Sequence, residues 1–368
     1  MNPGRAARIP ALDGLRAVAV LAVVAFHGGV LPLGQLGVDM FFAVSGYLIA
    51  TILVREHQRT GTIALRAFYA RRFRRLLPAL WITAAGALAL IGRADFSPHK
   101  TVLAVGVSLT YTMDVLWKLA PDSAMQHTWS LAVEEQFYLL FPVVLIALLR
   151  RGRPRDHTGK VVAFALGVSV LRAVVFLAIG GTNGHGFALY ATRFEPIVFG
   201  VAVAFVLADA DRSRFADAAV RRLTSPTAVG VAVTSLVAFQ LSAIGMDQHG
   251  FPKRLFLGGF TVTALATLVL VGYVVTREAS IVHRVLSWAP LVYVGKVSYG
   301  IYLFHYPALL VLRAHLTNRY TLTVTLAAVG IALAALSYEL IEKRFLRPTG
   351  ISIVAAPPAP PAPFPASG

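Results

Sequence analysis

The chain has 368 residues, of which 57% are hydrophobic and only 14% are charged, and its mean hydropathy is +0.69. Soluble domains are roughly 45–50% apolar and about 25% charged, so this composition indicates a polytopic membrane protein. A formal net charge of +17 would favour nucleic-acid binding in a soluble protein. Here the basic residues lie mostly between apolar runs, as the positive-inside rule requires. The absence of cysteine excludes disulfides, cysteine metal ligands and a cysteine acyl-enzyme.

Ten apolar runs are long enough to span a hydrocarbon core of roughly 30 Å, which takes about 20 helical residues. No signal-peptide cleavage motif follows the first run, so we expect it to remain as a helix. The sequence therefore predicts an all-α, polytopic membrane bundle of about ten transmembrane helices. These runs lie near residues 12–31, 37–54, 76–92, 132–149, 161–179, 187–208, 226–244, 255–276, 290–312 and 321–341.

The distribution of lysine and arginine orients the predicted helices. If residues 99–117 do not cross the membrane, most basic residues lie in cytoplasmic loops and both termini are cytoplasmic. A crossing there would move the basic stretch RRGRPR to the outside. We therefore expect residues 93–131 to form an outer segment that dips partly into the membrane. Residues 1–347 are expected to form the membrane domain, and residues 348–368 a disordered, proline-rich tail.

Three ionisable residues interrupt the first run, LDGLRAVAVLAVVAFH. Arg16 and His27 are eleven residues apart, which places them on one helical face and about 16 Å apart along the axis. Ionisable residues in a membrane helix face the bundle interior by default. The alternative is that Asp13 and Arg16 form an anchoring pair and that His27 is an interhelical hydrogen-bonding residue.

The motif GVDMFFAVSGYLI begins the second run and places Asp39 at about the depth of His27. A carboxylate beside an imidazole fixes its tautomer and stabilises the imidazolium as it forms. We therefore expect Asp39 to orient His27. The glycines and the serine of this motif are expected to let helices approach closely.

The motif FYARRFRRLLPAL places four arginines at the predicted cytoplasmic surface. Such residues often form a basic belt against anionic lipid. Arg72 and Arg75 also share one helical face, three residues apart, where their planar guanidinium groups can clamp phosphates. A phosphate site on this side favours a nucleotide-like cofactor such as coenzyme A.

Further polar residues lie in the later runs. Glu134 and Glu135, in HTWSLAVEEQFYLLFP, are predicted at the outer mouth of the fourth span, where acids often only complement the helix dipole. The motif TRFEPIVFG contains Arg193 and Glu195, which can pair with each other. The candidates for substrate binding are His127, Trp129, Glu135, Glu195 and His305.

Taken in order, these motifs, together with VSYGIYLFHYP and SYELIEKRF, resemble the bacterial membrane-bound acyltransferase 3 family, whose members O-acylate glycans and some antibiotics. The resemblance covers residues 8–347. It implies a ten-helix bundle, acyl-CoA as the donor and a hydroxyl acceptor. The family's motif residues fall on Arg16 and His27, on Asp39, on Arg72 and Arg75, and on Trp129, Ser130, Leu131 and Glu134.

We therefore predict a membrane O-acyltransferase of the bacterial inner membrane. It would move an acyl group, expected to be acetyl, from acyl-CoA to a hydroxyl of an envelope glycan or a glycosylated metabolite. His27 is the expected general base, and no metal or nucleic acid is expected to take part. The other expected catalytic residues are Arg16, Asp39 and Glu134, and the expected donor-binding residues are Arg16, Arg72 and Arg75.

Two alternatives stay open at this point. The first is a covalent acyl intermediate on Ser45 or Ser130. Many members of the family carry a further hydrolase-like domain after the bundle, whereas this chain has only the proline-rich tail there, so we expect direct transfer to the acceptor. The other is a transporter or flippase of a glycan or lipid-linked sugar, which would use the same polar path without chemistry. Inverted repeats would mark a transporter of that kind, and none is evident.

Overall fold

The structure is a computed structural model that describes residues 9–93, 97–179, 192–208, 214–243 and 253–346. Secondary structure within these ranges is helical, without a β-strand, and this confirms the predicted all-α class. The predicted tail, residues 348–368, lies outside them.

Apolar runs and the segments that flank them form the helices. The first half contains α1 (Pro10–His27), α2 (Leu36–Thr60), α3 (Leu65–Ala89), α4 (Pro98–Leu109), α5 (Met113–Leu116), the 3-10 turns η1 (Trp117–Leu119) and η2 (Gln126–Thr128), α6 (Trp129–Leu149) and α7 (Pro154–Ala178). The second half contains α9 (Glu195–Ala208), α10 (Arg214–Leu223), α11 (Pro226–Leu241), the π-turn η4 (Leu255–Gly259), α12 (Phe260–Thr276), α13 (Ile281–Leu286), α14 (Ala289–Lys296), α15 (Ser298–Leu312), α16 (Arg319–Ser337), the π-turn η5 (Tyr338–Glu342) and α17 (Lys343–Leu346).

Six helical segments are long and apolar enough to cross a membrane, counted over the described part of the chain. Three further apolar helices, α9, α11 and α15, are shorter. The protein is thus a multi-pass helical membrane protein, while the count of ten crossings stays a prediction. The six segments are Pro10–His27, Leu36–Thr60, Gln126–Leu149, Pro154–Ala178, Leu255–Thr276 and Arg319–Leu346.

The run near 290–312 differs from the single helix that its hydropathy predicts. It forms two helices, α14 and α15, which are separated at Val297, where φ is −95° and ψ is 7°. Hydropathy reports that a run is apolar but not where it bends, so this break could not be predicted. The doubtful run 99–117 forms the 12-residue helix α4 and a short continuation. Twelve residues rise only about 18 Å, which agrees with a segment that does not cross a core of roughly 30 Å.

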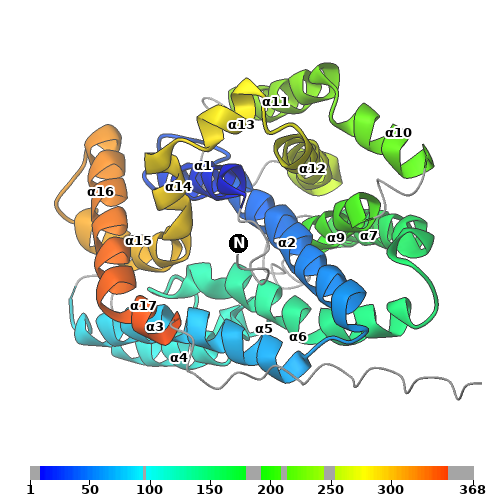
Figure 1. The fold of residues 1–368 in the computed structure, drawn as a ribbon. Coiled ribbons are helices and arrows are strands. Elements are labelled where there is room, and N and C mark those ends of the chain that lie inside the picture. Colours follow the sequence, from blue (N-terminus) through cyan, green and yellow to red (C-terminus); the bar gives the residue numbers. More distant parts are fainter. Residues whose placement is uncertain (1–8, 94–96, 180–191, 209–213, 244–252, 347–368) are drawn as a thin grey trace, which may run out of the picture.

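Figure 1 shows α1 and α2 in the middle of the bundle, with α15 and α16 on one side and α7, α9 and α12 on the other. Helices α3, α4 and α6 lie along a third side. Helix α1 packs against α2, α14 and α15, and α2 packs against α9 and α12. Asp13 of α1 and Asp39 of α2 are therefore buried inside the bundle.

Glycines allow α2 and α9 to touch backbone to backbone. A Cβ atom on Gly46 would lie 1.9 Å from the Ile197 carbonyl oxygen, and one on Gly200 would lie 2.3 Å from the Ala43 carbonyl oxygen. Only glycine fits such approaches. The packing role predicted for the glycines of the second motif is confirmed at Gly46, and the contact brings α2 beside the start of α9.

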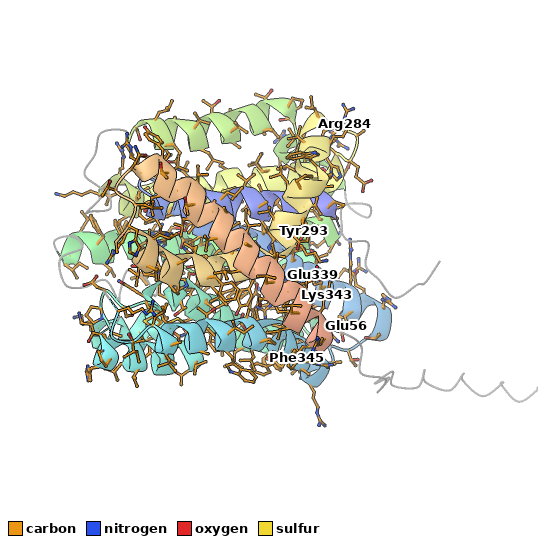
Figure 2. The ribbon with its side chains drawn as sticks, turned by 90° about the vertical axis from the view of Figure 1, so that its left-hand side faces the viewer. Glu56, Arg284, Tyr293, Glu339, Lys343 and Phe345 are labelled. Carbon is orange, nitrogen blue, oxygen red and sulfur yellow. The ribbon has the colours of Figure 1, made fainter. Side chains whose placement is uncertain are left out.

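Three segments that are predicted to be cytoplasmic lie toward one end of the bundle. Figure 2 shows Glu56, Arg284 and Lys343 toward the same end of the bundle, at the right of the view. They belong to α2, α13 and α17, which end or lie in three separate segments predicted to be cytoplasmic. The structure therefore gathers these segments at one end, and the side of the membrane that this end faces stays a prediction.

Candidate active site

Three histidines from distant parts of the chain form one cluster. His27 ends α1, His127 lies in η2 and His305 lies in α15. The Nε2 atom of His305 is 3.2 Å from Nδ1 of His27, and the ring centroids of His127 and His305 are 5.5 Å apart. The structure thus brings together the three histidines that the sequence predicted for one site.

Hydrogen bonds determine which nitrogen of His27 carries a proton. Nδ1 of His305 lies 2.6 Å from the Tyr302 carbonyl oxygen, which can only accept, so this nitrogen donates and Nε2 accepts. Nδ1 of His27 lies between two acceptors, Nε2 of His305 and the Val23 carbonyl oxygen at 3.0 Å. It must therefore donate, which leaves Nε2 of neutral His27 as the basic atom.

His127 carries the second free nitrogen lone pair of the histidine cluster. Its Nε2 atom is 3.1 Å from the Leu303 carbonyl oxygen and donates to it. Its Nδ1 atom is then an acceptor, and this buried atom has no hydrogen-bond partner in the described residues. Two of the three clustered histidines, His27 and His127, thus present an unprotonated nitrogen to which no described residue donates.

The histidine cavity, as we call it, has a volume of about 150 Å³. His27, His127 and Arg193 line this cavity, and aromatic side chains such as Trp129 and Tyr306 make up half of the remaining lining residues. A space of this size suits a small group and a hydroxyl. Both basic nitrogens therefore belong to residues that border a cavity.

A smaller cavity adjoins it on the side of Arg16. This Arg16 cavity has a volume of about 60 Å³ and is lined by Arg16, Ser45 and Glu134 among others. Val38 and Tyr302 line both cavities. The Tyr302 hydroxyl donates to the carbonyl oxygen of His127 at 2.6 Å, so this ring stands fixed between the two spaces.

The two serines that were candidates for a covalent intermediate are already hydrogen-bonded. Ser45 donates to Glu134, which also accepts from the Tyr138 hydroxyl at 2.7 Å. Ser130 lies 2.6 Å from the Tyr302 hydroxyl and donates to it, because Tyr302 donates elsewhere. No histidine is bonded to either serine in the described residues, so neither serine belongs to a serine–histidine pair.

Arg16 lies among charges of both signs. Its guanidinium is 4.0 Å from the Asp13 carboxylate, so the pair considered from the sequence forms only at long range. The charges of Glu134 and Arg75 also act on Arg16. Arg16 lines the Arg16 cavity as a cation. Because Asp13 is 4.0 Å away, it does not occupy all the N–H donors of the Arg16 guanidinium.

The predicted phosphate clamp of Arg72 and Arg75 is not found as a pair. Arg72 binds Glu135 through two hydrogen bonds of 2.5 and 3.3 Å and stacks on Tyr138 at 3.4 Å. Arg75 is exposed, and no hydrogen bond or salt bridge is found for it in the parts of the chain described. Its charge lies near those of Arg16 and Glu135, so Arg75 is the open cation of this group.

The Arg72–Glu135 pair also corrects the predicted depths. Arg72 was expected at the cytoplasmic surface and Glu135 at the outer mouth, yet the two side chains touch. Helix α3 begins at Leu65 and α6 at Trp129, so each residue lies about two turns into its helix. Glu134 and Glu135 are therefore interior groups, and the dipole interpretation is wrong for both.

Asp39 does not orient His27 as predicted. Its Oδ2 atom accepts a hydrogen bond of 2.6 Å from Nη2 of Arg193, and its Oδ1 atom has no hydrogen-bond partner in the described residues. Nδ1 of His27 donates instead to Nε2 of His305 and to the Val23 carbonyl oxygen. Asp39 faces Arg193 because α2 packs closely on α9, which directs Asp39 toward the start of α9.

Glu195 does not pair with Arg193 as the motif allowed. It forms a salt bridge with Arg172 of α7, and both side chains are fully buried. Sequence reasoning did not identify Arg172 as the partner of Glu195 and left the cavity-lining Arg193 out of the site, although each is an arginine in or beside an apolar run. That position was the signal, because intramembrane arginines face a partner or a cavity.

The described residues contain no group of three or more side chains that could hold a metal ion. Ionisable side chains line the two adjoining cavities: Arg16 and Glu134 line the smaller one, and His27, His127 and Arg193 line the larger one. The charge of the exposed Arg75 acts on Arg16 from outside these cavities.

A comparison with protein families shows that an acyltransferase domain model matches residues 9–339. The O-acetyltransferase OatA of Staphylococcus aureus (strain NCTC 8325 / PS 47) is 30% identical over 353 residues, which cover 91% of this chain and 56% of OatA. A second S. aureus protein (strain COL), SACOL0978, whose name assigns it provisionally as an O-acetyltransferase, is 31% identical over 362 residues, 92% of this chain and 57% of its own length.

The chain thus spans just over half the length of the curated relatives that it matches. No solved structure matches it significantly. The family match covers the helices that carry the histidine cluster, the Arg16 cavity and the paired arginines. The chain therefore belongs to the membrane-bound acyltransferase 3 family.

Proposed function

We propose that the protein is a bacterial inner-membrane O-acyltransferase that moves an acyl group from acyl-CoA to a hydroxyl group. Family membership and the names of the O-acetyltransferase relatives support the reaction class. The observation that carries the proposal is the basic Nε2 atom of His27 at a cavity of about 150 Å³. That volume favours acetyl over a long acyl chain.

His27 acts as the general base in this proposal. The acceptor hydroxyl attacks the thioester carbonyl carbon as its proton passes to Nε2 of His27. The C–S bond then breaks, and the proton on His27 passes to the CoA sulfur. The acceptors on the opposite nitrogen, Nε2 of His305 and the Val23 carbonyl oxygen, stabilise the imidazolium formed between these steps.

The donor reaches this base through the Arg16 cavity. Arg75 and Arg16 supply positive charge for the phosphates of acyl-CoA, while Arg72 is held by Glu135 and keeps the adjoining helices in place. In the proposed topology both termini and Arg75 are cytoplasmic, where acyl-CoA is made. Arg16 and His27 are about 16 Å apart along α1, a distance that the extended pantetheine arm can bridge.

The acceptor is proposed to be a hydroxyl of an envelope glycan or of a glycosylated metabolite. It enters from the side of the histidine cavity, opposite to the donor. Trp129 and the tyrosines of this cavity provide aromatic faces on which a sugar ring can pack. Direct transfer to the acceptor fits the arrangement, because neither Ser45 nor Ser130 is bonded to a histidine in the described residues.

The test is an assay of the purified protein in lipid nanodiscs with acetyl-CoA and glycans from its own cell envelope. An acyltransferase releases free CoA only when an acceptor is present and yields an equal amount of O-acetylated glycan. Binding of acetyl-CoA without release of CoA for every glycan and glycosylated metabolite supplied would contradict the proposal. That result would favour the transporter alternative.

A further inference from the structure

Two buried salt bridges lie side by side near the histidine cavity. One joins Arg193 to Asp39, and the other joins Arg172 to Glu195. Relative exposure is 2% for Arg193 and 0% for the other three residues. Both guanidinium groups face the ring of Phe260, Arg193 at 4.2 Å and Arg172 at 5.3 Å.

Only Arg193 among these four residues lines the histidine cavity. Its guanidinium lies between two aromatic rings, those of Phe260 and of Trp129 at 4.9 Å. Nη2 donates to Asp39, whereas the buried Nε atom has no hydrogen-bond partner in the residues described. The side chain is therefore immobilised at a cavity with donors to spare.

The net charge of the group indicates what Arg193 can bind. The two arginines and two carboxylates sum to zero, so the cavity holds no uncompensated cation for an ionised substrate. A guanidinium that is already paired can still donate hydrogen bonds to a neutral carbonyl oxygen. The energy of those bonds rises when that oxygen becomes negative in a water-poor space.

We propose that Arg193 stabilises the oxyanion of the acyl-transfer step and that Asp39 positions it. This inference rests on the proposed function and assigns it a further catalytic residue. When the acceptor oxygen attacks, a C–O bond forms and the carbonyl π pair moves onto the thioester oxygen. Arg193 donates N–H groups to that oxygen while His27 takes the proton.

Collapse of the tetrahedral intermediate completes the acyl transfer. The oxygen lone pair re-forms the C=O bond, the C–S bond breaks and its electron pair leaves on the CoA sulfur. The proton held by His27 then passes to that sulfur. Arg193 neither gains nor loses a proton. Its hydrogen bonds to the oxygen strengthen as negative charge develops, so they lower the barrier more than they favour binding of the substrate.

The experiment measures kcat and KM for acetyl-CoA and for a glycan acceptor in nanodiscs. Removal of an oxyanion donor lowers kcat by about 10²–10³-fold. We expect this loss in the Arg193→Met/Asp39→Asn double variant, which removes both charges together and so leaves no unpaired buried ion. Arg193→Lys keeps the cation but not the planar set of donors, so its kcat should lie between those of the double variant and the parent. KM values for both substrates should stay within a few-fold of the parent's.

The second salt bridge provides a matched control. Arg172→Lys alters an equally buried arginine that faces Phe260 but lines neither cavity, and it should leave kcat close to the parental value. Equal losses of kcat in Arg172→Lys and Arg193→Lys would overturn the proposal, because both arginines would then only support the fold. A raised acceptor KM at parental kcat in the Arg193 variants would overturn it in favour of substrate binding.

The two proposals fail in different ways. A parent protein that binds acetyl-CoA but transfers to no acceptor contradicts the proposed function, and the role of Arg193 falls with it. An active parent with fully active Arg193→Lys and double variants contradicts the role of Arg193 alone.

Discussion

The imidazole rings of His27 and His305 are joined by a hydrogen bond of 3.2 Å between Nδ1 of His27 and Nε2 of His305. His305 is itself anchored through Nδ1 to the Tyr302 carbonyl oxygen. Because of these two hydrogen bonds, the proton of neutral His27 lies on Nδ1, and Nε2 is left unprotonated as a base requires. It also connects the end of α1 to α15, which is the side of the cavity that carries Tyr302.

His305→Ala should lower kcat without abolishing activity. The variant removes one of the two acceptors of Nδ1 of His27 and leaves the Val23 carbonyl oxygen. A hydrogen bond of this kind contributes about 1 kcal/mol, so kcat should fall roughly fivefold at unchanged acetyl-CoA affinity. Steady-state kinetics checks this prediction. A loss as large as that of His27→Ala would show that His305 itself takes the proton.

Arg75→Ala should weaken acetyl-CoA binding while leaving the protein stable, because Arg75 is exposed and forms no salt bridge in the described residues. Arg151→Ala, which removes another exposed arginine, is the control and should bind acetyl-CoA normally. Titration of acetyl-CoA into nanodiscs measures both affinities. Equal affinities in the two variants would return Arg75 to a lipid-facing basic belt.

Arg72→Ala should instead destabilise the fold. The change leaves the Glu135 carboxylate, 12% exposed in the pair, without its cation. Breaking a fully buried salt bridge costs about 3–5 kcal/mol, so the loss of this partly buried pair should cost less but remain measurable. Thermal unfolding in detergent should therefore show a lower midpoint for Arg72→Ala than for Arg75→Ala. The reverse order would mean that Arg72 is free for the donor.

Gly46→Ala tests the packing of α2 on α9. The new methyl group would meet the Ile197 carbonyl oxygen, and overpacking of this kind costs roughly 1–3 kcal/mol. Gly167→Ala in α7 is the control, since a Cβ atom there has no neighbour within 4 Å. Its unfolding midpoint should equal or exceed the parental one, because alanine favours the helix. Unchanged stability of Gly46→Ala would show that the two backbones are not in contact.

The topology can be tested with single cysteines, because the chain has no native cysteine. Thr62 follows α2 in a segment predicted to be cytoplasmic, and Thr317 lies between α15 and α16 in one predicted to be outside. Both residues are exposed. In intact cells an impermeant thiol reagent should label Thr317→Cys and spare Thr62→Cys. The opposite pattern would reverse the orientation of the whole bundle.

Much of the helical fold was predictable because apolar runs of membrane length leave few alternatives to a helix. The association of His27, His127 and His305 was also predictable in outline, since intramembrane histidines seek the bundle interior. Which charged residues pair with one another could not be predicted. Hydropathy and spacing place a residue along its own helix but do not give the rotation of that helix or its neighbours.

Two corrections illustrate this limit. Asp39 was assigned to His27 on depth alone, but the glycine contact between α2 and α9 directs it to Arg193. Glu135 was placed at a surface because its run was taken to begin at residue 132, and the added turn of α6 moves it inward to Arg72. In both cases a contact between two helices decided the outcome.

The most direct test of the account is the rate of acyl transfer by His27→Ala. A positioned general base contributes about 10²–10⁴-fold to a rate, so the variant should bind acetyl-CoA like the parent and release CoA to an acceptor at a rate lower by that factor. His57→Ala, a change in α2 away from both cavities, should retain the parental rate. A transfer rate for His27→Ala close to that of His57→Ala would contradict the assignment of His27 as the base.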